Sequence, residues 1–280
     1  MNKPVRLTAL ASIVVLLVAA CGSAGPSAAP SLLDVVTKAG KIRVSTDPNY
    51  APQSFQNSDG TFEGFDIDVA TEVAKRMKLE VEFLPQAWAA ITAGNWGGRW
   101  DMSVGSMTVT PERKKVVDFS PPYYYTPAQM AASKASGITT IDGMAGKKIC
   151  AGESTTYLDW LNQTEARPAV DATPPPNSTV VTQKTDADCA QQWAAGRNDF
   201  EGWLTAGPTV EEAIKQNQPV VMVGGPIYFE PLAIAVDKSG PDDATFVAKL
   251  KTIIDEMHAD GTLSTLSQKY YGKDLTQVPK

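Results

Sequence analysis

Gly105-Ser-Met-Thr-Val-Thr-Pro-Glu-Arg-Lys-Lys115 is the stretch around which the rest of this sequence can be arranged. It follows the alternating segment 100–104, which is typical of a β-strand. Thr110 is a good helix N-cap and Pro111 suits the first helical position, so the stretch predicts a loop that opens a helix. The first turn would carry Arg113 and two lysines, where the helix dipole disfavours cations. A cation beside free backbone N–H groups suits the binding of a carboxylate; the alternative is a solvated basic turn.

The first 20 residues have the pattern of a secretory signal peptide. Lys3 and Arg6 form a positively charged start, and the apolar segment 7–20 that follows is short for a membrane span. The run Leu17-Val-Ala-Ala-Cys21 resembles a bacterial lipobox. We therefore expect cleavage before Cys21 and a lipid on that cysteine; an uncleaved membrane anchor is the alternative.

Residues 21–34 are expected to form a tether, because Ser, Ala, Pro and Gly dominate residues 22–31. No later segment is apolar enough over a sufficient length to span a membrane. The mature protein is therefore expected to be extracytoplasmic and held at the cell membrane by its lipid.

Composition and charge exclude several classes of function. The chain has 280 residues, of which 43% are hydrophobic, as in a globular protein of one large or two mid-sized domains. Removal of Lys3 and Arg6 from the 25 basic residues leaves 23 against 31 acidic ones, a net charge of −8. An acidic surface argues against binding to nucleic acid.

Cysteine usage fits an exported protein, and histidine usage argues against a metal site or a histidine-dependent catalytic system. Cys150 and Cys189 form an even pair once Cys21 is lipidated, which in an oxidising compartment predicts one disulfide. Two buried free thiols are the alternative. His258 is the only histidine, so a Ser-His-Asp or Cys-His system is not expected, and two cysteines at this spacing match no zinc pattern. We expect neither a metal nor a cofactor.

Apolar periodicity predicts two α/β units, one inserted into the other. In the first unit, strands are expected at 41–45, 80–84 and 100–104, with helices at 31–40, 65–77 and 88–98. In the second, strands are expected at 147–151, 178–182, 200–204 and 219–223. Helices are expected at 185–196 and 208–216, and another is opened by the loop 152–156 and runs to about residue 162. A strand at 231–236 and helices at 241–259 and 263–271 then return to the first unit.

This order predicts an α/β fold with two lobes, each a mostly parallel sheet flanked by helices. Lobe 1 is expected to be discontinuous, formed by residues 35–126 and 231–280, and lobe 2 by residues 127–230. Two crossover strands would form a hinge between them. A cleft between two such lobes is the expected ligand site.

Three motifs together resemble those of the bacterial extracellular solute-binding proteins of family 3, the polar amino-acid receptors of ABC importers. They are Ile42-Arg-Val-Ser-Thr-Asp-Pro-Asn-Tyr-Ala-Pro52, Gly64-Phe-Asp-Ile-Asp-Val69 and the extended stretch Gly105 to Ser120. The resemblance covers about residues 35 to 275. It implies the two-lobed type II fold of periplasmic binding proteins, a monomer, and an ABC permease as membrane partner.

The resemblance also implies ligand-binding roles for residues of lobe 1. Arg113 is expected to pair with the ligand α-carboxylate, which the backbone N–H of Thr108 would also contact. The carbonyl of Ser106 would accept from the ligand ammonium, and Met107 lies between these two positions. Tyr50 and Trp88 would flank the ligand side chain, and Asp47 lies where some members recognise a polar or basic side chain. Core packing for the two aromatic residues, and loop capping for Asp47, are the alternatives.

From lobe 2, the resemblance implies carboxylate donors at Ser154, Thr155 and Thr156, which match the family's Gly-x-Ser/Thr-Thr helix start. A bidentate guanidinium together with N–H groups from two lobes would satisfy the lone pairs of a carboxylate.

The sequence departs from the family pattern at the ammonium site. The segment Gly196 to Ala206 carries about two extra residues, and the aspartate expected there falls near Leu204 or Ala206. Glu201 or Glu230 would then bind the ammonium, or the ligand is not a standard α-amino acid. Gln53 replaces an aromatic residue, so we expect a more polar pocket.

The predicted function is therefore that of a lipid-anchored receptor that delivers a polar amino acid to an ABC permease, without turnover. Cyclohexadienyl dehydratases resemble the same family, so an enzyme is one alternative, with Glu153, Glu201 or Glu230 as general acid. A sensory module that signals through a membrane partner is another.

Overall fold

The computed structural model of the chain describes residues 29–279. The predicted signal peptide, Cys21 and most of the predicted tether lie outside the described residues. Helix α1 (Leu32–Ala39) begins at a capping box between Ser31 and Asp34 and buries Leu32 in the core. The tether predicted for 21–34 is therefore too long at its C-terminal end, where its last three residues are helical.

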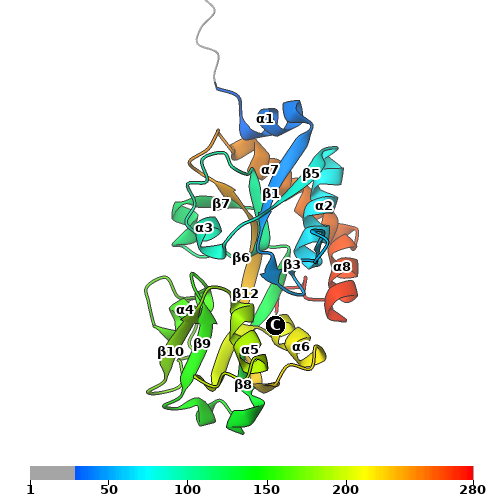
Figure 1. Cartoon of the computed structure of the whole chain (residues 1–280). Helices are drawn as coiled ribbons and strands as arrows, with labels where there is room; N and C mark the ends of the chain where they lie inside the picture. The colour runs from blue at the N-terminus through cyan, green and yellow to red at the C-terminus, as the bar shows by residue number, and fades with distance from the viewer. Residues whose placement is uncertain (1–28, 280) are drawn as a thin grey trace, which may run out of the picture.

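The elements form two groups, lobe 1 and lobe 2, joined through the long strands β8 (Tyr124–Ser133) and β12 (Val220–Asp237) (Figure 1). The shared sheet has the strand order β10-β9-β11-β8-β12-β6-β1-β5, with β7 paired to β12. The sequence patterns 219–223 and 231–236 predicted two strands; β12 joins them into one strand, with a register shift between Val223 and Tyr228. This mixed α/β architecture confirms the predicted fold class.

Lobe 1 is built on a parallel core. Strand β1 pairs in parallel with β5 and β6, whereas β12 joins β6 antiparallel. The other bounds are β1 (Lys41–Thr46), β2 (Asn49–Tyr50), β3 (Ser54–Gln56), β4 (Phe62–Glu63), α2 (Phe65–Met77), β5 (Glu80–Pro85), α3 (Trp88–Thr92), β6 (Met102–Thr108), β7 (Val117–Phe119), α7 (Ala244–Ala259) and α8 (Thr262–Tyr271).

Lobe 2 repeats this plan. Strand β9 pairs in parallel with β10 and β11, and β11 pairs antiparallel with β8. The bounds are β9 (Lys148–Gly152), α4 (Thr156–Leu161), β10 (Thr179–Gln183), α5 (Asp186–Ala194), β11 (Gly202–Ala206) and α6 (Gly207–Lys215). The predicted disulfide is present between Cys150 of β9 and Cys189 of α5, with a Cα–Cα distance of 5.9 Å.

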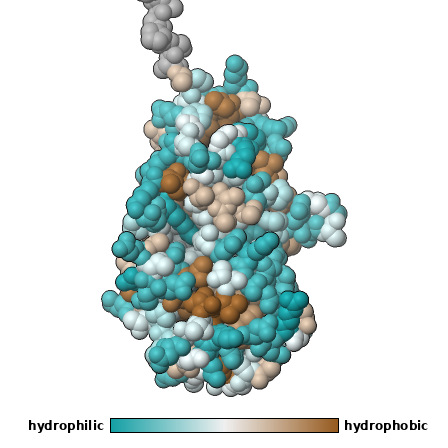
Figure 2. All heavy atoms as spheres, turned by 60° about the vertical axis from the view of Figure 1, so that its left-hand side comes forward, coloured by the Kyte–Doolittle hydropathy of each residue, from teal (hydrophilic) through white to brown (hydrophobic). Residues whose placement is uncertain are grey.

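The buried hydrophobic side chains separate by lobe. Two clusters draw on residues 32–124 and 232–263, and two draw on residues 128–228. The face in Figure 2 is mostly hydrophilic, with smaller hydrophobic patches on each lobe. The separation of the cores supports the proposed lobe boundaries near residues 126 and 230.

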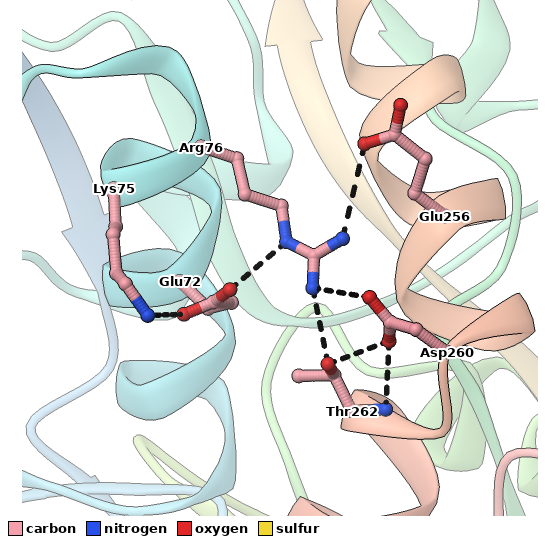
Figure 3. A network of polar contacts seen from close by, with 6 residues as sticks. All are labelled: Glu72, Lys75, Arg76, Glu256, Asp260 and Thr262. Carbon is pink, nitrogen blue, oxygen red and sulfur yellow. Dashed lines mark hydrogen bonds and ion pairs between the residues drawn. The ribbon is translucent and has the colours of Figure 1, made fainter.

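The C-terminal helices are attached to the first part of lobe 1 by Arg76 of α2 (Figure 3). Its guanidinium donates to Glu72 Oε1 at 2.9 Å, to Asp260 Oδ2 at 2.7 Å and to Thr262 Oγ1 at 3.0 Å. Because Asp260 and Thr262 lie where α7 meets α8, this network joins two segments of lobe 1 that are far apart in the sequence.

Two predicted helices are shorter in the structure. The helix predicted for 88–98 ends at Thr92, because the following chain takes positive φ at Asn95 and at three glycines. Asp237 of β12 accepts from the backbone N–H groups of Asn95 and Trp96, which fixes this loop. The helix predicted after Thr110 is a single 3₁₀ turn, Arg113–Lys115, because the chain enters β7 directly afterwards.

Candidate functional site

A cavity lies between the lobes, with an empty volume of about 460 Å³ that includes its opening. Its walls come from the carboxyl ends of β1, β6 and β9, the starts of α4 and α5, and the middle of β12. The lining residues are Asp47, Tyr50, Trp88, Gly105, Ser106, Thr108 and Arg113 from lobe 1, Gly152, Glu153, Thr155, Thr156, Tyr157, Lys184, Thr185 and Asp186 from lobe 2, and Glu230.

Arg113 brings a buried cation to this cavity. Thr110 Oγ1 accepts from the Arg113 backbone N–H at 3.2 Å, which fixes the turn after β6. The guanidinium donates to the carbonyl of Thr108 at 3.1 Å and to the carbonyl of Ser154, in lobe 2, at 3.0 Å, and it lies 5.4 Å from the centre of the Trp88 ring. Within residues 29–279 no carboxylate forms an ion pair with it, and burial lowers the pKa of Arg113.

Glu230 is the buried acid of the hinge. Its side chain is 1% exposed, and it accepts a hydrogen bond from the hydroxyl of Thr156. Burial raises the pKa of Glu230, while the positive charge of Arg113 partly offsets this. The two opposite charges therefore act on each other across the cavity without direct contact, which leaves a polar gap between them.

Two further carboxylates face the cavity from opposite lobes. Asp47 follows β1, and its Oδ1 accepts from the Asn49 N–H at 2.8 Å. Asp186 begins α5 and accepts from the Gly152 N–H at 2.8 Å and from Thr205 Oγ1 at 3.1 Å. Burial raises the pKa of Asp47 to about 6 and that of Asp186 to about 7. The negative charge of Asp188 adds to the first shift, and those of Asp47 and Glu230 add to the second.

Ser106 is held in an unusual conformation at the base of the site. Its φ is +56°, in the left-handed region that non-glycine residues seldom adopt. Its hydroxyl donates to Asp66 Oδ2 at 2.7 Å and also contacts the hydroxyl of Tyr124, while its N–H donates to the hydroxyl of Tyr123 at 3.1 Å. Burial raises the pKa of Asp66 to about 7. This network sets the direction of the backbone beside the cavity.

The lobes touch each other around the cavity, so the structure is a closed form. Trp88 Nε1 donates to the carbonyl of Ser154 at 3.1 Å, and Asn49 Nδ2 donates to Thr185 Oγ1 at 3.0 Å. Gln53, which was expected to make the pocket more polar, lies outside the cavity lining. Its amide instead donates to Thr209 of lobe 2 at 3.1 Å.

The structure brings most of the predicted site residues together. Eight of them line the cavity: Asp47, Tyr50, Trp88, Ser106, Thr108, Arg113, Thr155 and Thr156. Met107 does not, because alternation along β6 turns its side chain into the lobe 1 core. Ser154 is exposed and contributes only its carbonyl. Glu201 lies elsewhere, since its Oε2 accepts from the Lys148 N–H at 3.0 Å.

Asp186 is the main residue that sequence reasoning missed. The family pattern places an acid near residues 204–206, whereas Asp186 follows Thr185, which forms a capping box with Asp188 directly after β10. Ligands in open α/β sheets bind outside the carboxyl ends of the strands. The capping box indicates a helix start at such an end, but the sequence does not show that this end faces the cleft. Within residues 29–279, no group of three or more His, Cys, Asp or Glu side chains is arranged to hold a metal ion.

Comparison with known proteins agrees with this geometry. The model of the bacterial extracellular solute-binding proteins, family 3, matches residues 42–273. The L-cystine-binding protein TcyJ of Escherichia coli K12 is 31% identical, over 88% of each chain. The lysine/arginine/ornithine-binding periplasmic protein of the same strain is 27% identical, over 82% of this chain and 87% of its own.

Solved structures give the same relationship. The ancestral amino acid-binding protein AncCDT-1, a precursor of cyclohexadienyl dehydratase, is 30% identical with a TM-score of 0.73, over 86% of this chain and all of its own. An ancestral arginine-binding protein bound to arginine is 28% identical with a TM-score of 0.71, over 83% of this chain and 99% of its own. The chain therefore belongs to the bacterial extracellular solute-binding proteins of family 3.

Proposed function

We propose that the protein binds an amino acid in the cleft between its lobes and delivers it to the permease of an ABC importer. The observation that carries this proposal is Arg113, a buried guanidinium on the cavity wall that forms no ion pair with any carboxylate of residues 29–279. A buried charge without a counter-ion is costly, so it favours a ligand that supplies one.

The ligand head group fits the gap between Arg113 and Glu230. Arg113 uses two of its N–H groups on carbonyls, which leaves donors for a ligand α-carboxylate. The ligand ammonium would then donate to Glu230, the buried acid on the other side of the gap, and to the Ser106 carbonyl. This assignment replaces Glu201, whose carboxylate is engaged outside the cavity.

Closure of the lobes follows from this placement. Arg113 comes from lobe 1, Thr155 and Thr156 come from lobe 2, and Glu230 lies on the strand that connects the lobes. A ligand that contacts all of them binds the closed form more tightly than an open one and shifts the population toward it. The permease would recognise that closed form. The relatives named above, which are binding proteins for amino acids, support this function.

A lipid on Cys21 would keep the protein beside the permease, as the lipobox indicates. None of the helices between residues 29 and 279 combines the length and hydrophobicity that a membrane span requires. Replacement of Cys21 by Ser should therefore release the protein from the membrane fraction of its host, and retention of the variant would contradict lipid anchoring. We also propose that the protein acts as a monomer.

The function is tested by thermal denaturation with a panel of amino acids and their α-carboxamides. A ligand at 100 times its Kd should stabilise the protein by about 2.7 kcal/mol. The matching carboxamide should give no shift, because it cannot pair with Arg113. Absence of a shift with every amino acid would contradict the proposal.

One observation favours a second candidate, a dehydratase of the cyclohexadienyl type. Glu230 is a buried carboxyl with a raised pKa beside a cation, which is the environment of a general acid. Incubation with prephenate or arogenate, followed by a search for phenylpyruvate or phenylalanine, tests it. Product formation that requires Glu230 would support this candidate. Absence of product would favour the binding protein over the dehydratase.

A further inference from the structure

Resting on the proposed function, we infer that Asp66 of α2 is a positioning residue for the ligand ammonium. Its carboxylate holds Ser106 in the conformation that leaves the Ser106 carbonyl free to accept from the ammonium. Asp66 acts through Ser106 and does not touch the ligand. It determines how strongly the protein prefers an amino acid to the same acid without its α-amino group.

The backbone at Ser106 is released from both strands that flank β6. Strand β12 pairs with β6 at Met107 and again at Ser103, with a register shift between them, and β1 pairs with β6 no further than Ser103. Ile234, which lies opposite the shift, uses its N–H and its carbonyl on Ser120 instead. Irregularities of this kind change the direction of a strand beside a functional site.

The N–H and the hydroxyl of Ser106 are both engaged inside lobe 1. The N–H donates to the hydroxyl of Tyr123 at 3.1 Å, and the hydroxyl donates to Asp66 Oδ2 at 2.7 Å. Ser106 lines the cavity, so its carbonyl is the polar group that remains for a ligand. A backbone carbonyl accepts hydrogen bonds and suits an ammonium, which only donates them.

Asp66 closes this arrangement into a ring of three side chains. Its Oδ1 accepts at 2.7 Å from the hydroxyl of Tyr123, the same hydroxyl that accepts from the Ser106 N–H. Asp66 is completely buried, and no lysine or arginine of residues 29–279 forms an ion pair with it. The ring opposes the unfavourable positive φ of Ser106. A buried carboxylate is costly, although the start of α2 favours its charge.

The motif Gly64-Phe-Asp-Ile-Asp-Val69 also supplies a matched control. Asp68, like Asp66, lies in the first turn of α2. Its Oδ2 accepts from Lys269 Nζ at 2.6 Å and from the hydroxyl of Tyr270 at 2.8 Å, so it joins α2 to α8. Only Asp66 of the two aspartates contacts a residue that lines the cavity.

Isothermal titration calorimetry tests the inference with each amino acid that binds and its desamino acid. Lysine is paired with 6-aminohexanoate, and cystine with dithiodipropionate. The unaltered protein should bind the amino acid about 100-fold more tightly or better. Asp66→Asn should reduce this preference by about tenfold or more, mainly by weakening the amino acid, whereas Asp68→Asn should leave it unchanged.

A merely structural role for Asp66 would weaken both members of a pair equally, and an unchanged preference in Asp66→Asn would overturn the inference. Equal binding of both members by the unaltered protein would also overturn it. If Asp66→Asn does not fold, Ser106→Ala and Tyr123→Phe each remove one hydroxyl of the ring and should reduce the preference. An unchanged preference in both would again contradict the inference.

A double variant shows whether Asp66 acts through Ser106. Asp66→Asn combined with Ser106→Ala should reduce the preference no further than the stronger single variant, because both changes break the same ring. Additive losses would place the action of Asp66 elsewhere. If no amino acid binds the unaltered protein, the proposed function itself fails, so the two failures can be told apart.

Discussion

The two walls of the cleft position their charged groups by different means. On the lobe 1 wall, two local contacts hold Arg113, with Thr110 three residues earlier and with the Thr108 carbonyl five residues earlier, and one further contact reaches the Ser154 carbonyl of lobe 2. On the lobe 2 wall, Asp186 is held by Gly152 and Thr205, which lie 34 and 19 residues away in the sequence. A cation that a local motif positions can be predicted from the sequence, whereas an anion that tertiary contacts position cannot.

Removal of the disulfide should have the largest effect on the lobe 2 wall. Cys150–Cys189 joins β9 to α5, and the ends of these two elements form the lobe 2 wall. Replacement of both cysteines by Ala should lower the free energy of unfolding by roughly 3–4 kcal/mol, as expected for a loop of this length. Denaturant titration measures this loss.

If the walls differ as described, the cysteine variant should also bind ligand more weakly, because the backbone that anchors Asp186 is less constrained. Control replacements of Met222 and Ile214, exposed residues of lobe 2, by Ala should leave the affinity unchanged. A cysteine variant with full stability and full affinity would show that the lobe 2 wall does not depend on this cross-link.

The pH dependence of binding should also distinguish the two walls, with the second-largest effect. Burial raises the pKa of Asp47 to about 6 and that of Asp186 to about 7, and the charged groups beside them are Asp188, Glu230 and the exposed Lys184. Ionisation of both aspartates makes the cleft more negative, so the affinity for a positively charged amino acid such as arginine should rise at least tenfold from pH 5 to pH 8.

Titration calorimetry with arginine across this range gives the measurement, and citrulline should show a smaller change. Arg113 stays charged throughout and contributes no such dependence. An arginine affinity that falls toward pH 8, or that does not change, would contradict the ionisation of the two aspartates in this pH range.

Replacement of the capping threonine of each wall should have the smallest effect. Thr110→Ala removes the acceptor for the Arg113 N–H, and Thr185→Ala removes the cap of α5 together with the contact to Asn49. Each should cost about 1 kcal/mol of stability. Thr185→Ala should additionally weaken ligand binding, because it removes a contact between the lobes. Thermal denaturation with and without ligand separates these effects, and equal ligand shifts in both variants would count against this difference.

Much of the fold could be predicted because its signals are local. The apolar spacing of residues 65–77 indicates a helix and the even pair of cysteines indicates a disulfide, and the structure contains both. The prediction of a helix over 88–98 is wrong beyond Thr92, because Asp237, more than 140 residues later, accepts hydrogen bonds from the N–H groups of Asn95 and Trp96 that would continue the helix. A contact between residues so far apart in the sequence does not change the local periodicity of apolar residues.

The candidate site shows the same limit. The motif from Gly105 to Lys115 placed Arg113, Thr108 and Ser106 on one wall, and the structure brings them to the cavity. Glu201 lies near the expected aspartate in sequence, but it directly precedes β11, and its Oε2 accepts from the Lys148 N–H outside the cavity. Asp186 required knowledge of which strand end lies beside β11, which only the assembled sheet provides.

The most direct test of the central claim is titration calorimetry with the best-binding amino acid and three proteins: the unaltered chain, Arg113→Ala and Lys114→Ala. Lys114 is the exposed neighbour of Arg113 in the same turn, so it controls for the loss of a positive charge. We predict that Arg113→Ala weakens binding about 100-fold or more, roughly 3 kcal/mol, whereas Lys114→Ala changes it less than threefold. An Arg113→Ala protein that binds as tightly as the unaltered chain would contradict the carboxylate clamp.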